Sequence, residues 1–291
     1  VSYAGLAGAV SNGGGLGIIA SGMLTPDTLK EQIEIAKTLT DKPFGVNIMM
    51  LRDDVDDIFQ TVLDNPVAVV TTGAGNPGKY INDLKDKGIK VATVVASIAL
   101  AKRLERAGAD AIIAEGMEAG GHIGELTTMC LVPSVSETVD IPVIAAGGII
   151  DGRGVAAALM LGAKGVQMGT RFICSEEAEI NIRVKERVVE ARDRDTTVTG
   201  RCTGHPVRVI RNKLARQMEA LDKANAPDEL MKLGKNSLRR AMEEGDIDGG
   251  SLMCGQGAAL VKKIQPAAEI ILDVMKQTES IIRGSQSVVK D

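Results

Sequence analysis

The sequence holds two histidines among 291 residues, and one of them lies in a glycine-rich stretch. His122 is the centre of GGHIG, residues 120–124. A core histidine is normally framed by bulky apolar side chains, whereas an imidazole in a loop can donate a proton or a hydrogen bond to a substrate oxygen. We therefore expect His122 to be catalytic, with a structural histidine as the alternative. His205, among basic residues further along the chain, is the weaker candidate.

Two further glycine-rich stretches have the composition of phosphate-binding turns. AAGGI (145–149) contains Gly147 and Gly148, and MGTRF (168–172) contains Gly169 and Thr170. Glycine lets the backbone approach an anion closely, and backbone N–H groups after the last two strands of a barrel commonly bind phosphate. Thr170 adds a hydroxyl donor. The alternative is that these glycines only permit tight turns.

Three polar side chains fall in or just after apolar runs. Asn47 lies inside FGVNIMM, Glu115 ends AIIAE, and Gln167 lies in GVQMG. A buried polar group needs a partner. Asn47 therefore bonds the adjacent backbone or presents its amide to a planar ring in a barrel mouth, and we favour the ring. Gln167 faces the same choice, and Glu115 either faces a ring or pairs with a lysine.

The elements that position these residues are short apolar runs without clean alternation, as strands buried on both faces are. Most begin 21 to 24 residues apart, with amphipathic helices between them. Repeated strand–helix units of this kind form a parallel sheet. Because nearly every run ends in a polar, glycine-rich loop, we predict an α/β fold of the TIM (β/α)8 barrel type. Seven runs are visible, so an eighth strand is expected before Val1. The runs are 15–21, 44–50, 68–75, 90–97, 111–116, 142–148 and 165–172.

The chain after about residue 176 has a different character. We expect barrel strands 2–8 over 1–176, a charged, helical insertion or lid over 177–250, and a segment over 251–291 that packs back on the barrel. Five basic residues and no acidic one occur from Arg201 to Arg216. This run either steers an acidic partner or forms a solvated surface helix.

Composition excludes several classes of protein. The formal net charge of −4 argues against nucleic acid as a partner. No apolar run is long enough to span a membrane, and no secretory signal is visible. The four cysteines are scattered, which favours free thiols in a cytoplasmic protein over a disulfide framework, and a structural metal site is not expected.

Taken together, the motifs resemble the FMN-dependent enoyl-acyl-carrier-protein reductase II family along the whole chain. They are AGAVSNGGGLGIIASG, KPFGVNIMM, VVTTGAGNPGKY, AEGMEAGGHIGELTTM, PVIAAGGI and QMGTRF. Nitronate monooxygenases are similar and share the Gly-His element and both phosphate loops. GNPGKY and the GELTTM that follows the histidine loop favour the reductase. The family's first strand, with its flavin contact, has no counterpart in this sequence.

The resemblance implies FMN whose phosphate is held by Gly147, Gly148, Gly169 and Thr170. It further implies Asn47, Glu115, Gly121 and Gln167 along the flavin, and His122 as the catalytic histidine. NADH or NADPH would be a transient hydride donor, since no dinucleotide-binding fingerprint is present. Acyl carrier protein would be the partner, and the protein would be a homodimer. GGSLMCGQ (249–256) resembles the family's monovalent-cation loop.

The function implied is reduction of a trans-2-enoyl thioester during fatty acid elongation, with the hydride passing through flavin N5. His122 would supply a hydrogen bond or a proton to the thioester, where negative charge develops. The alternative is a nitronate monooxygenase that uses FMN and oxygen. A flavin-free barrel acting on a sugar phosphate is less expected, since the strand ends offer no lysine, and a non-enzymatic binding barrel is weaker still.

Overall fold

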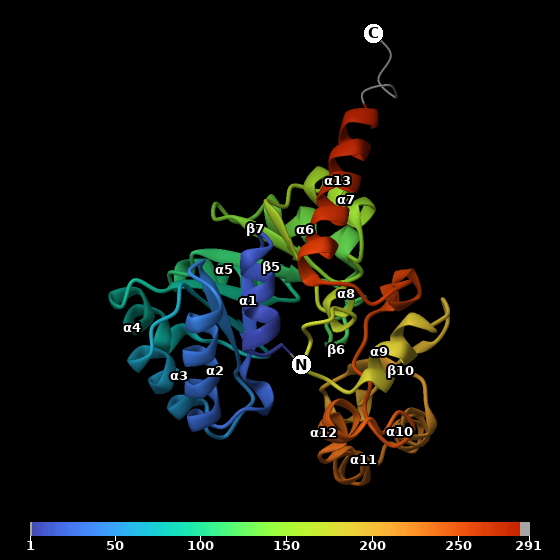
Figure 1. Cartoon of the computed structure of the whole chain (residues 1–291). Helices are drawn as coiled ribbons and strands as arrows, with labels where there is room; N and C mark the ends of the chain where they lie inside the picture. Colours follow the sequence, from blue (N-terminus) through green and yellow to red (C-terminus); the bar gives the residue numbers. More distant parts are fainter. Residues whose placement is uncertain (1, 286–291) are drawn as a thin grey trace.

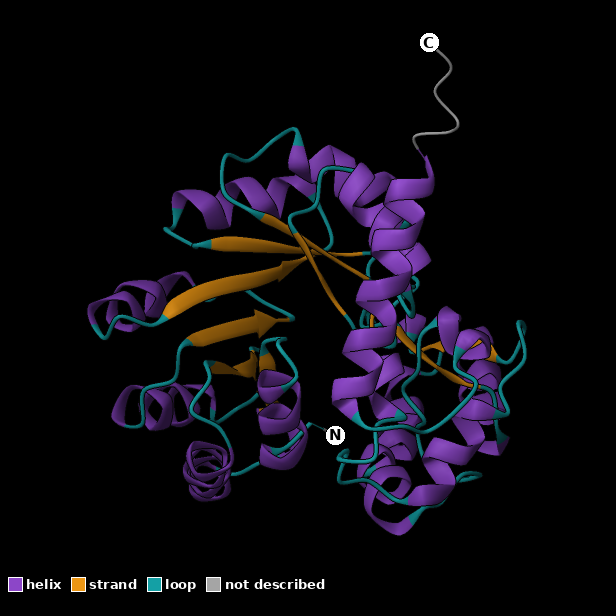
Figure 2. Ribbon diagram, turned by 45° about the horizontal axis from the view of Figure 1, so that its top comes forward, coloured by secondary structure: helices purple, strands orange, loops and turns teal. Residues whose placement is uncertain are grey.

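A parallel sheet of seven strands forms the centre of the computed structural model, which describes residues 2–285 (Figures 1 and 2). The strand order is β1-β2-β3-β4-β5-β7-β8, so each strand lies beside the next one along the barrel. All seven predicted strands are confirmed. They are β1 (Gly17–Ala20), β2 (Phe44–Met49), β3 (Val69–Gly73), β4 (Lys90–Val95), β5 (Ala111–Glu115), β7 (Val143–Ala146) and β8 (Gly165–Gln167).

Helices pack on the outer face of this sheet (Figure 2). Side chains cap the starts of two of them: the hydroxyl of Thr25 accepts the backbone N–H of Thr28, and the carboxylate of Asp151 accepts that of Arg153. Such caps satisfy N–H groups that have no partner within the helix. The helices are α1 (Ala4–Asn12), α2 (Pro26–Leu39), α3 (Val55–Asp64), α4 (Ile81–Asp86), α5 (Ile98–Arg106), α6 (Thr128–Ser136) and α7 (Gly152–Met160). Short 3-10 turns occupy Ser21–Met23 and Gly78–Tyr80.

The sheet is open between β1 and β8, which are its two end strands. Ser2 lies along the free edge of β1, where its carbonyl accepts the N–H of Ala20 at 2.8 Å and its hydroxyl donates to the carbonyl of Ile18 at 2.6 Å. The chain therefore reaches α1 from the side of β1 on which another strand would pair. The eighth strand lies outside the described residues and stays a prediction.

The C-terminal part differs from the expected helical insertion because it contains a second, three-stranded antiparallel sheet. Its order is β6-β10-β9, with β6 (Gly121–His122), β9 (Thr196–Thr199) and β10 (Val207–Ile210). Both later strands are only four residues long, too short to show a clear period. The basic run from Arg201 to Arg216 is the expected surface helix or docking face. Half of this run lies in a strand or in turns.

The remaining helices of this part pack around the small sheet and against the barrel. They are α8 (Thr170–Ile173), α9 (Ile182–Val189), α10 (Lys213–Lys223), α11 (Pro227–Gly234), α12 (Ser237–Arg239), a π-helical turn (Arg240–Glu244), 3-10 turns (Arg201–Thr203 and Gln256–Leu260) and α13 (Ala267–Ser285). The last of these returns to the barrel and lies along α7 (Figure 1). Among the described residues, no helix is long and apolar enough to cross a membrane. The four cysteines are free.

Candidate functional site

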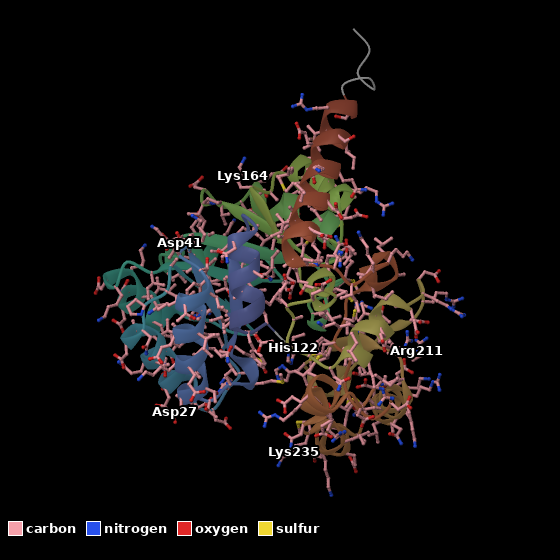
Figure 3. All side chains as sticks on the ribbon, viewed as in Figure 1. Asp27, Asp41, His122, Lys164, Arg211 and Lys235 are labelled. Carbon is pink, nitrogen blue, oxygen red and sulfur yellow. The ribbon has the colours of Figure 1, made fainter. Side chains whose placement is uncertain are left out.

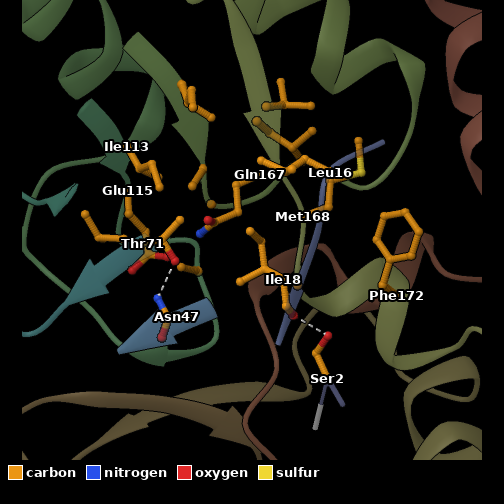
Figure 4. A pocket seen from close by; sticks show the side chains of 18 of the residues that line it. Ser2, Leu16, Ile18, Asn47, Thr71, Ile113, Glu115, Gln167, Met168 and Phe172 are labelled. Carbon is orange, nitrogen blue, oxygen red and sulfur yellow. Dashed lines mark hydrogen bonds between the residues drawn. The ribbon is translucent and has the colours of Figure 1, made fainter. Parts of the chain in front are cut away.

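A cavity of about 950 Å³ lies inside the curved sheet and is lined by residues from both ends of its strands (Figure 4). This volume is within the range of cofactor and ligand sites. Aliphatic side chains dominate its wall, among them Ile18, Ile113, Ile144, Val166 and Met168. Every predicted site residue except Gly121 lines the cavity. Gly121 is buried beside it, and its backbone pairs with Arg208 in the small sheet.

The two glycine turns after β7 and β8 meet at one end of this cavity. Gly147 and Gly148 have φ angles of +94° and +73°, a conformation in which glycine is favoured. The backbone N–H groups of Gly148, Gly169 and Thr170 have no hydrogen-bond acceptor among the described residues. A Cβ added at Gly169 would meet nothing within 4 Å. Unpaired N–H groups around open space fit a phosphate better than tight turns alone do.

The side chain of Thr170 is fixed by a hydrogen bond from a remote segment of the chain. Its hydroxyl oxygen accepts the backbone N–H of Gly255 at 2.9 Å. Gly255 belongs to the stretch 249–256 that resembles a cation loop, and Met253 and Gly255 line the cavity. The described residues include no cluster of three or more His, Cys, Asp or Glu that could hold a metal ion. The monovalent cation therefore stays a prediction.

Asn47 bonds a neighbouring side chain, not the adjacent backbone as one alternative had it, and its contact with a planar ring stays a prediction. Its amide Nδ2 donates to Oγ1 of Thr71 on the neighbouring strand at 2.9 Å, and the residue also lines the cavity (Figure 4). The bond fixes the orientation of the amide and leaves its oxygen without a partner among the described residues. Gln167, on β8, points towards the same part of the cavity and has no such bond (Figure 4).

Glu115 is the last residue of β5. Its side chain lies in the cavity wall and has no basic partner among the described residues. Burial raises the pKa of this carboxyl to about 7, because the charged form loses hydration. No hydrogen bond or ion pair to Glu115 is found in the described part of the chain, so the lysine pairing considered above does not occur. The side chain reaches the cavity near Thr71 (Figure 4). Such a group is half-protonated near neutral pH and can serve as hydrogen-bond donor or acceptor.

His122 stands at the mouth of the cavity, on the short strand β6. Its backbone pairs with Val207 of β10, which tethers the histidine loop to the C-terminal part of the molecule. Burial lowers the pKa of the imidazole, and His205 lowers it further. The ring is therefore mostly uncharged at neutral pH. The side chain is half-buried and lines the cavity, so the catalytic role of His122 stays a prediction.

The sequence reasoning missed several residues that support the site. Arg208 is 4% exposed, and its Nε donates to the carbonyl of Met117 in the histidine loop at 3.1 Å. Glu118 accepts the backbone N–H of Thr128 at 2.9 and 3.0 Å, at the start of α6. Both contacts join segments far apart in the sequence, and no local pattern reveals them. His205, the weaker histidine candidate of the sequence, also lies at the site, since its ring centroid is 6.5 Å from that of His122.

A curved parallel sheet, paired glycine turns and a cofactor-sized cavity define a flavin-dependent oxidoreductase of the barrel type. The family model described as nitronate monooxygenase matches residues 1–277, and the chain belongs to this family. The resemblance to enoyl-acyl-carrier-protein reductase II is confirmed by a solved structure. The chain is 51% identical to FabK from Thermotoga maritima with a TM-score of 0.97, over 99% of this chain and 92% of that one.

Two curated relatives carry other names. A protein of Staphylococcus saprophyticus named "Probable nitronate monooxygenase" is 33% identical over 95% of this chain and 91% of its own length. A Rhodococcus jostii "(3aS,4S,5R,7aS)-5-hydroxy-7a-methyl-1-oxo-octahydro-1H-indene-4-carboxyl-CoA dehydrogenase" is 42% identical over 74% of this chain. The matched part spans 61% of that relative's length, under two thirds of it.

Proposed function

We propose that this chain reduces the carbon–carbon double bond of a trans-2-enoyl thioester, with FMN as its cofactor and NADH or NADPH as hydride donor. The observation that carries the proposal is the chemistry of the cavity wall. It is aliphatic and offers no free cation. The names of two similar proteins, FabK and the carboxyl-CoA dehydrogenase, point to the same class of reaction or ligand.

The single lysine that lines the cavity is Lys90 at the start of β4. It lies at the amino end of the sheet and pairs with Asp110 at 3.0 Å, while the site residues gather at the opposite end. The other ionisable wall residues near the histidine are the carboxyls of Glu115 and Glu118. A nitronate is a small anion and is stabilised by a cation, which this end of the cavity does not provide. A neutral acyl thioester suits such a wall.

The residues present fit FMN. The unpaired N–H groups of Gly148, Gly169 and Thr170 would hold its phosphate, and Asn47 and Gln167 would face its ring system. When bound, FMN supplies hydride transfer between the nicotinamide and the β-carbon of the enoyl thioester. The protein's contribution is to orient both partners in a wall that excludes water.

His122 would donate a hydrogen bond to the thioester oxygen. Its lowered pKa keeps the ring neutral near pH 7, so it acts through an N–H and carries no net charge. Negative charge develops on the oxygen as the β-carbon accepts hydride, and a donor placed there strengthens as the charge grows. Glu115, near half-protonation, is the nearest wall group able to return a proton.

The acyl carrier protein is proposed as the partner because exposed basic residues flank β10. Arg201, Arg211 (labelled in Figure 3), Lys213 and Arg216 are exposed, whereas Arg208 is buried and belongs to the fold. Complementary charge raises the rate of encounter with an acidic protein. Replacing Arg211 and Arg216 with Gln should raise KM for a carrier-protein thioester and spare the CoA thioester. Equal effects on both substrates would reject this docking face.

The second candidate is nitronate oxidation, which the family description favours. Anaerobic mixing of the FMN-loaded protein with NADH separates the two. We expect the flavin absorbance to fall and then to return when crotonyl thioester is added. If NADH has no effect and alkyl nitronates bleach the flavin instead, the reductase proposal is wrong.

The role of His122 is tested on the same protein. We expect His122→Ala to keep FMN absorbance and to lower enoyl turnover about 100-fold, the lower end of what a positioned donor contributes. Turnover equal to that of the unmodified protein would remove His122 from the mechanism.

A further inference from the structure

The two histidines of the chain face each other across the mouth of the cavity. Their ring centroids are 6.5 Å apart and the planes are inclined by 82°, an edge-to-face arrangement. Both also line a hollow of about 250 Å³ next to the main cavity, together with Leu51, Ala74 and Pro206. His122 is half-buried and His205 is exposed, so the second ring covers the first from the solvent side.

Backbone contacts on both sides fix this approach. Val207 pairs with His122 in the β6–β10 ladder, and the N–H of Ile123 donates to the carbonyl of Pro206 at 3.1 Å. The residue after each histidine is therefore tied to the partner segment. Two segments of remote sequence are thus held at a fixed spacing by main-chain bonds.

The turn that carries His205 is itself braced. The carboxylate of Asp222 accepts the N–H groups of Gly200 at 2.7 Å and Cys202 at 3.0 Å. The N–H of His205 donates to the hydroxyl of Thr203 at 3.2 Å. These bonds anchor the turn that carries His205 to α10 through Asp222. The turn is therefore held in place by hydrogen bonds and is not a loose surface loop.

The other charged groups near His122 either bond to other residues or lie elsewhere in the cavity. Glu118 is bound at the start of α6, and the guanidinium of Arg208 on β10 is turned to the histidine loop. Glu115 lies deeper in the cavity, at the end of β5. Burial is the main cause of the lowered pKa of His122. The neighbouring imidazole of His205 is the second cause.

We propose that His205 is a positioning residue for His122: it packs edge-to-face on that ring and holds it towards the cavity. The value of this arrangement rests on the proposed function, in which a neutral imidazole N–H meets the thioester oxygen. The neighbouring imidazole of His205 lowers the pKa of His122, because it disfavours the charged form of that ring. The pair thereby extends to lower pH the range over which His122 stays neutral.

NMR titration of the imidazole Cε1–H signals tests the proposal on the chain as it is, without flavin or substrate. Because the sequence has two histidines, each single variant assigns the spectrum. We expect His205→Gln to move the titration midpoint of His122 to higher pH, and His205→Lys, with a permanent charge, to move it lower than in the unmodified protein. Arg194→Gln removes an exposed charge near β9 and should leave the midpoint in place.

An unchanged His122 midpoint in both His205 variants would overturn the proposal, and so would an equal shift in Arg194→Gln. If His205→Gln fails to fold, His205→Lys alone decides by the direction of the shift. In enoyl turnover, the acid limb of the pH profile should move to higher pH in His205→Gln. If the unmodified protein does not reduce an enoyl thioester, the proposed function is wrong. The NMR titration would still test the histidine pair.

Discussion

The side chain of Glu115 destabilises the fold when it is ionised, and the same side chain can exchange a proton with a ligand. Its carboxyl sits in an aliphatic wall with a pKa of about 7, and no cation compensates its charge in the described residues. Placing an ionised carboxylate there is unfavourable, and the fold tolerates it because the group can be protonated instead. The same property suits a group that exchanges a proton with a ligand.

A stability measurement tests this view of Glu115. A carboxyl whose pKa is raised on folding stabilises the fold fully below its unfolded pKa, and this contribution is lost as pH rises from 4.5 through about 7. We expect Glu115→Gln, which cannot ionise, to raise the free energy of unfolding at pH 8 by about 2 kcal/mol relative to the unmodified protein. At pH 5 the difference should be small.

The control is Glu125→Gln, which changes an exposed carboxyl beyond the histidine loop. It should leave the urea denaturation midpoints unchanged at both pH values. If Glu115→Gln has the same effect at pH 5 and pH 8, the carboxyl is not desolvated as described.

At the scale of elements, β10 carries more of the site than its length suggests. It positions His122 through backbone pairing, and its Arg208 donates to the carbonyl of Met117 and to Oγ1 of Thr196. The histidine loop is thus held from the C-terminal part of the molecule. The three glycines of this loop contribute no side chains, so few side chains besides that of Glu118 hold it.

Replacement of Arg208 tests the dependence of the loop on β10. Arg208→Ala leaves the half-buried carbonyl of Met117 without its donor, which costs about 1 kcal/mol. We expect a lower Tm and faster amide hydrogen exchange at residues 117–123. Arg194→Gln, an exposed neighbour of β9, should change neither. Protection of the loop unaltered in Arg208→Ala would show that other contacts hold it.

The barrel strands were predictable because each is encoded locally. AIIAE and VIAA are apolar runs closed by glycine or a polar residue, and Thr25 and Asp151 are recognisable caps. The same logic found the glycine turns and placed His122 at a strand end. The approach of His205 to His122 depends on β10 pairing with β6, a long-range contact that no local pattern encodes.

At the scale of the whole molecule, three remote segments form one cavity. The glycine turns come from the barrel, the histidine from the loop after β5, and the backing residue Gly255 from the chain that returns to the barrel before α13. Figure 3 places His122 between the barrel and the C-terminal part. Function in this protein therefore requires both parts to be folded together.

The central claim is that backbone amides after β7 and β8 hold the phosphate of FMN beside His122. A comparison of FMN with riboflavin, which lacks the phosphate, isolates this contribution. Gly148→Ala forces a side chain onto a residue with φ of +73°, with its Cβ 3.2 Å from that of Glu118. Gly88→Ala is the matched control, since φ is +74° there and nothing lies within 4 Å.

The deciding measurement is the Kd of both flavins by fluorescence quenching, in the unmodified protein and in the two glycine variants. We predict that FMN binds about 10- to 100-fold more tightly than riboflavin, as charged hydrogen bonds to phosphate require. Gly148→Ala should reduce this ratio and Gly88→Ala should preserve it. Equal affinities for FMN and riboflavin in the unmodified protein would contradict the account.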